Sequence, residues 1–104
     1  MLDKMKQMKQ LLDVQKKAKG IQKELRDTEI EAVSSDGKVT VVFNGELKLV
    51  NLSIDSDYMD NNSISDLEKS LSTTISEAMS KAQQVAAEKT RDIMKEMNIN
   101  LPGL

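Results

Sequence analysis

The side chains able to do chemistry in this 104-residue chain are amines, carboxylates and hydroxyls, because it contains no Cys and no His. The chain therefore lacks the usual acid–base group near neutral pH, the commonest metal ligand and all thiol chemistry. Pairs of carboxylates occur among its 17 acidic residues, but no spacing marks one pair as a catalytic site. We name no catalytic residue, no cofactor ligand and no small-molecule substrate, and we do not expect an enzyme.

The clearest functional pattern is a row of basic residues near the N-terminus, which we call the basic stripe: Lys16, Lys19, Lys23 and Arg26. Their spacings of three, four and three place them on one side of a helix. No acidic residue shares this face, although an exposed helix gains stability from Glu and Lys four residues apart. Two interpretations stay open, a solvated helix face and a surface that contacts phosphate groups. Lys9, earlier on the same predicted helix, is a further candidate for such contacts.

The types of basic and aromatic residue favour duplex DNA as the ligand of a phosphate-binding surface. Thirteen of the fifteen basic residues are Lys, and only Arg26 and Arg91 could read guanine with two hydrogen bonds. The aromatic residues are Phe43 and Tyr58, too few to form a stacking platform for single strands. We therefore expect contacts to phosphates with little preference for base sequence.

Charge is sorted along the chain, although the net charge is only −2. Residues 1–26 hold eight basic and three acidic residues, a balance of +5. Residues 27–68 hold two basic and ten acidic residues, a balance of −8, and the remainder is close to neutral at +1. Such asymmetry is evidence about partners, and it favours an anionic partner at the N-terminal end.

An acidic segment after the predicted strands resembles a calcium loop only superficially. Counted from Asp55 as an EF-hand, Met59 occupies the fifth position, Asp60 the sixth, where Gly is required, and Asp66 the twelfth, where Glu is required. We expect an acidic loop ahead of a helix and no metal site.

The basic stripe needs a long helix, and residues 2–26 predict one, since this segment has no Pro and Gly20 as its single Gly. Its apolar residues follow two registers displaced around the axis. One contains Leu2, Met5, Met8 and Leu12, and the other contains Leu11, Val14, Ala18, Ile21 and Leu25. One surface cannot cover both, so either the two halves pack on different neighbours, one of them a partner subunit, or the first turns are exposed.

Residues 28–55 predict a three-stranded antiparallel sheet, because apolar residues alternate with polar ones in three short runs separated by turn residues. Asn44-Gly45 predicts a two-residue type I′ hairpin turn, with positive φ at both residues. Successive apolar residues at Leu49 and Val50 predict either a β-bulge in the third strand or a strand that is apolar on both faces.

Residues 65–97 predict a second long helix opened by a capping box of Ser65 and Glu68, and residues 98–104 predict a tail. We expect one α+β domain over residues 1–104. A helix of about 25 residues is ~37 Å long, whereas strands of about seven residues span ~23 Å. The helices therefore project beyond the sheet with exposed Met and Leu, which predicts a homodimer.

Membrane binding is disfavoured by the sequence. No run approaches the ~20 apolar residues of a membrane span, no apolar signal segment opens the chain, and the basic helix lacks Trp and Phe. We expect a cytoplasmic protein. The seven Met residues favour core and dimer packing over an adaptable binding groove.

Five segments in this order resemble the YbaB/EbfC family of bacterial nucleoid-associated proteins: MKQMKQ at 5–10, KVTVVFNG at 38–45, VNLSID at 50–55, EAMSKA at 77–82 and LPGL at 101–104. The resemblance implies a helix, three strands and a helix, a tweezer-like homodimer, and DNA binding in the nucleoid by the helical parts. Carried over to this sequence, it points to the basic stripe, and also to Lys89, Arg91 and Lys95 near the end of the last helix. The alternative is a helical protein-interaction adaptor that does not bind DNA.

Overall fold

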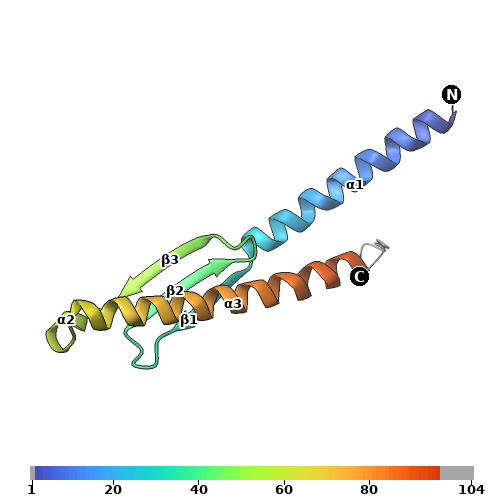
Figure 1. Cartoon of the computed structure of the whole chain (residues 1–104). Helices are drawn as coiled ribbons and strands as arrows, with labels where there is room; N and C mark the ends of the chain where they lie inside the picture. The colour runs from blue at the N-terminus through green and yellow to red at the C-terminus, as the bar shows by residue number, and fades with distance from the viewer. Residues whose placement is uncertain (1, 97–104) are drawn as a thin grey trace.

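The computed structural model describes residues 2–96 as two long helices joined by a small sheet (Figure 1). The elements are α1 (Leu2–Asp27), β1 (Glu29–Val33), β2 (Val39–Asn44), β3 (Leu49–Ile54), α2 (Tyr58–Asn61) and α3 (Ile64–Glu96). The predicted α+β architecture is confirmed, with one short helix, α2, inside the segment expected to be a loop. The predicted tail at 98–104 and the last residue of the predicted helix 65–97 lie outside the described residues.

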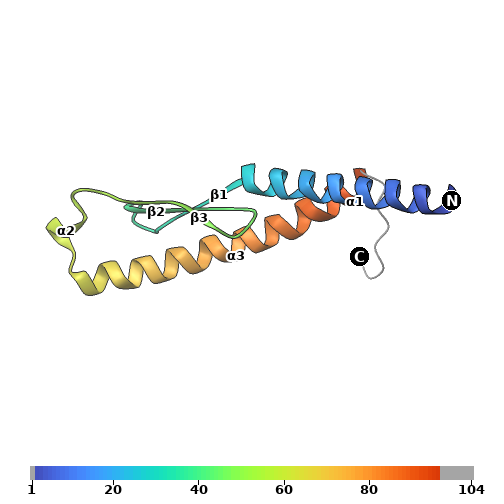
Figure 2. The same ribbon diagram turned by 90° about the horizontal axis from the view of Figure 1, so that it is seen from above.

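The core lies between α3 and one face of the antiparallel sheet, whose strand order is β1-β2-β3 (Figure 2). Alternation along β2 directs Val39, Val41 and Phe43 toward α3, where they are buried. The facing residues of α3 include Ala78 and Ala82, both fully buried. Their small side chains let the helix approach the sheet closely.

The third strand extends the apolar face of the sheet beyond the reach of α3. Its register pairs Leu49, Leu52 and Ile54 with the buried residues of β2, so they point to the same side as the core. The helix packs on β1 and β2, however, and leaves these three residues 54%, 43% and 39% exposed. The register shift skips Val50, which confirms the predicted bulge.

The β2–β3 connection differs from the predicted type I′ turn, which is wrong. The Leu47 N–H donates to the Asn44 carbonyl over 3.0 Å, and Leu47, at φ 65°, takes the left-handed conformation that Gly45 does not. This is a three-residue loop with a left-handed third residue. The Asn44 side chain decides the outcome, because its Oδ1 accepts hydrogen bonds from the N–H groups of Glu46 and Lys48.

Gly45 serves instead as the junction between this loop and the end of α1. Its N–H donates to the carbonyl oxygens of Leu25, over 2.8 Å, and of Thr28, over 3.0 Å. A Cβ atom at this position would lie 2.7 Å from the Leu25 oxygen. Only glycine allows this approach, which holds the last turn of α1 against the sheet.

The start of α3 differs from the predicted capping box of Ser65 and Glu68, which is also wrong. Ser63 and Asp66, two residues earlier, exchange hydrogen bonds: Asp66 N–H to Ser63 Oγ, and Ser63 N–H to Asp66 Oδ2. Ser63 and Asp66 are three residues apart, the same spacing as Ser65 and Glu68. The Asp66 carboxylate accepts a hydrogen bond from the Ser63 N–H, as the Glu of a capping box does. The hydrogen bond from the Ser63 backbone N–H, first, and the Ser63 side chain lower the pKa of the Asp66 carboxyl.

The first helix is an arm that projects from the sheet (Figure 2). None of its described residues is buried, and Lys17, Ile21 and Leu25 are half-buried on the side that meets α3. Both apolar registers of the first half are exposed, from 57% at Leu12 to 77% at Leu2. The first turns are therefore exposed in the single chain, and their packing on a partner subunit stays a prediction. The described molecule measures 72 × 22 × 18 Å.

Candidate nucleic-acid interface

The lysines of the basic stripe lie on the outer side of the arm. Residues 17, 21 and 25 face α3, and Lys16, Lys19 and Lys23 occupy the opposite side of the same turns. All three are exposed, and within residues 2–96 none of them forms an ion pair. Three amines on one face of a protruding helix are free to contact phosphates.

Arg26, the fourth member of the stripe, is held at the base of the arm. Its Nε donates to Glu46 Oε1 in the β2–β3 loop over 2.9 Å. The arginine side chain is still 61% exposed, whereas the glutamate side chain is only 19% exposed. Glu46 therefore competes with a phosphate for this guanidinium.

The other predicted DNA contacts divide between three places. Lys9 is exposed on the first half of the arm, and Lys89 bridges α3 to α1 through an ion pair of 3.2 Å with Glu24. Arg91 and Lys95 are exposed on the side of α3 opposite the buried Ile93. The structure therefore does not bring the residues of α3 and the basic stripe onto one surface of the chain.

The charge asymmetry of the sequence becomes a spatial one. The N-terminal arm lies at one end of the long axis and α2 at the other (Figure 1). The acidic residues Asp55, Asp57 and Asp60 gather around α2, where Asp57 pairs with Lys38 over 3.2 Å. Among the described residues no group of three or more acidic side chains is arranged to hold a metal ion.

A cavity of about 430 Å³ between the β1–β2 turn and α3 was not predicted. Asp36, Lys69, Thr74 and Glu77 contribute to its lining, and the Thr74 hydroxyl is buried without a hydrogen-bond partner. The Ser34 hydroxyl, 2.6 Å from Asp36, is the main cause of a lowered pKa of that carboxyl. These residues lie in two separate segments of the chain and are of types common on protein surfaces, so no sequence spacing predicts the cavity. Because two acidic side chains and one lysine line it together, the cavity is not suited to bind DNA.

Comparison of the sequence with known protein families places the chain in one of them. The model of the YbaB/EbfC DNA-binding family matches residues 1–97. The chain belongs to this family. A nucleoid-associated protein of Prochlorococcus marinus is 30% identical over 100 residues, which cover 92% of this chain and 83% of the relative. One of Gloeothece citriformis is 37% identical over 93 residues, covering 88% and 77% of the two chains.

A solved structure supports the same fold. The crystal structure of an uncharacterized protein from Helicobacter pylori superposes with a TM-score of 0.57 and 24% sequence identity. The match covers 84% of this chain and 98% of the other. Within residues 2–96, the structure contains no helix that is both long and apolar enough to cross a bilayer.

Proposed function

We propose that this member of the YbaB/EbfC family is a nucleoid-associated homodimer that holds duplex DNA by phosphate contacts from the basic stripe. The observation that carries the proposal is the row of Lys16, Lys19 and Lys23, exposed and without ion pairs in the described part of the chain, on a helix that projects from the body. The family description and the names of the relatives support DNA as the ligand and the nucleoid as the location. Lysine contacts to phosphates carry little sequence information, so the binding is weakly specific.

The uncovered face of β3 supports the homodimer. Leu49, Leu52 and Ile54 form an apolar strip beside α3 on an edge strand, and an exposed edge of this kind is usually covered by a partner. The opposite face of the same strand presents Asn51 and Ser53, which suit water. A second copy packed on the strip about a two-fold axis would cover it in both subunits and place two arms on one particle.

The first test is the salt dependence of binding to a random-sequence duplex, with the mass recorded by light scattering in the same buffers. About eight phosphate contacts per dimer lower the affinity by roughly 10³ to 10⁵ between 50 and 200 mM salt. A dimer that ignores DNA at low salt would reject the proposal in favour of an adaptor.

The site assignment is tested by charge reversal. We expect the triple variant Lys16→Glu, Lys19→Glu, Lys23→Glu to lose binding at 100 mM salt and to keep the native mass, because three contacts become repulsive. The matched control reverses Lys48, in the loop just before β3, and Lys69 and Lys81, on α3. It makes the same change in net charge, and we expect it to retain most of the affinity. Equal losses in the two variants would show that net charge, and not the stripe, governs binding.

A further inference from the structure

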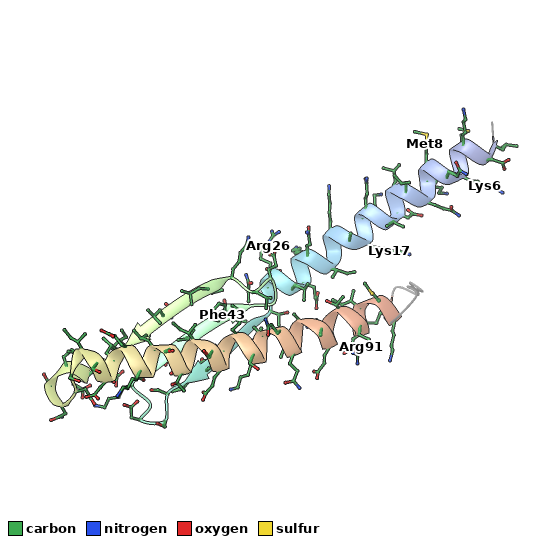
Figure 3. The ribbon with its side chains drawn as sticks, viewed as in Figure 1. Lys6, Met8, Lys17, Arg26, Phe43 and Arg91 are labelled. Carbon is green, nitrogen blue, oxygen red and sulfur yellow. The ribbon has the colours of Figure 1, made fainter. Side chains whose placement is uncertain are left out.

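The outer side of the arm changes from basic to apolar toward its tip. Met5, Met8 and Leu12 are 70%, 68% and 57% exposed, and they form what we call the tip ridge. Their spacings of three and four continue into Lys16, Lys19 and Lys23, so ridge and stripe lie on the same side of α1. Figure 3 shows Met8 and Arg26 projecting to one side of the arm, and Lys6 and Lys17 to the other.

The tip ridge is flanked by cations. At 3.6 residues per turn, Lys4 and Lys9 lie about 70° to either side of the ridge. Both are exposed, and neither forms an ion pair within the described residues. Asp3 lies on the far side of the helix from the ridge, and Asp13 lies beyond Lys9. The tip therefore presents an apolar line between two positive charges.

Duplex DNA matches this cross-section. A helix about 10–12 Å in diameter fits a major groove about 12 Å wide, where the phosphates of the two strands form the two walls. The floor of the groove is polar except for the C5-methyl group of thymine, which accepts apolar contacts. Lysines at both flanks face the two walls, and the ridge faces the floor. A protein groove of the same shape would need acidic rims on both sides to match Lys4 and Lys9.

We propose that the tip ridge lies in the major groove of the bound duplex and contacts thymine methyl groups through Met5, Met8 and Leu12. The inference rests on the proposed function and adds a base preference to it: the stripe holds the backbone, and the ridge favours thymine-rich DNA. Burial of one methyl group corresponds to about a fourfold gain in affinity.

The experiment compares two duplexes of identical sequence in which thymine is present or is replaced throughout by uracil, which lacks the methyl group. We expect the native protein to bind the thymine duplex about fourfold more tightly for each methyl group that it buries. The variant Met5→Gln, Met8→Gln, Leu12→Gln should bind both duplexes equally and keep the native salt dependence. Glutamine preserves the helix propensity of these positions. The control Leu11→Gln, Val14→Gln alters equally exposed residues of the other register and should keep the difference between the duplexes.

The outcomes separate this inference from the proposed function. Salt-dependent binding that is equal for the two duplexes in the native protein overturns the ridge contact and leaves the phosphate mechanism standing. Absence of binding to either duplex at low salt overturns both. A change in particle mass on substituting the ridge, measured without DNA, would make it a surface between copies of this chain and would overturn the contact with thymine.

Discussion

Arg26 is the residue whose role the structure alters most. Its spacing from Lys23 makes it part of the basic stripe, yet its guanidinium is bound by Glu46, twenty positions along the chain. An ion pair with so exposed an arginine contributes about 0–1 kcal/mol to stability. The main effect of the ion pair is therefore that Glu46 neutralises one positive charge of the basic stripe. Its contribution to the stability of the loop is small.

Glu46→Gln is predicted to tighten DNA binding, because it frees Arg26 for a phosphate and removes a negative charge beside it. Because both subunits of the proposed dimer carry the substitution, one added contact per subunit steepens the slope of log affinity against log salt by about 1.8. We expect the midpoint of urea unfolding to stay close to native, since surface substitutions usually change stability by less than about 0.5 kcal/mol. Glu88→Gln on α3 makes the same charge change away from the stripe, and an equal gain there would refute the local explanation.

At the scale of elements, Gly45 decides where the arm points. Gly45→Ala places a Cβ atom against the Leu25 carbonyl, so the last turn of α1 must move and give up the 2.8 Å hydrogen bond. We predict a loss of about 1–3 kcal/mol in the free energy of unfolding. Thermal unfolding of the variant and of the native protein measures this loss of stability.

Gly37→Ala is the comparison for this prediction. Gly37 has φ 76° but open space around its Cα, so that substitution carries only the conformational cost of a left-handed alanine, about 1 kcal/mol. If Gly45→Ala were no more destabilising than a surface change, the loop would not be the anchor of the arm.

The order of helices and strands could be predicted from the sequence because it depends on local periodicity. Alternation placed Val39, Val41 and Phe43 on the core face, and spacings of three and four placed the lysines on one side of α1. The turn after Asn44 could not be predicted in the same way, since the Asn44 side chain and the contact of Gly45 with Leu25 act together there.

Predictions about the site reached a similar limit. The exposure of Lys16, Lys19 and Lys23 followed from their spacing, but the separation of Arg91 and Lys95 from them depends on how α3 crosses the sheet. The apolar strip of β3 is another such case. Alternation assigns Leu52 to the core face, and only the position of α3 shows that this residue stays 43% exposed in the described chain.

For the whole molecule, the proposed dimer makes Leu52 a decisive position. Leu52→Lys places a charge in the centre of the apolar strip, and we predict a particle of half the native mass by light scattering. Because a monomer carries one arm, the slope of log affinity against log salt should fall to about half. Ser53→Lys adds the same charge to the opposite face of β3 and should remain dimeric. A dimer with the Leu52→Lys substitution would place the subunit contact elsewhere.

The absence of buried side chains along α1 has a thermal consequence. Without packing, the helical state of the outer turns depends on a local helix–coil balance, which shifts toward coil on warming. DNA that captures the arm must then order those turns, and fixing each residue costs about 1–2 kcal/mol of backbone entropy. Binding therefore carries a heat of folding in addition to the release of counterions, and its enthalpy becomes more negative as the temperature rises.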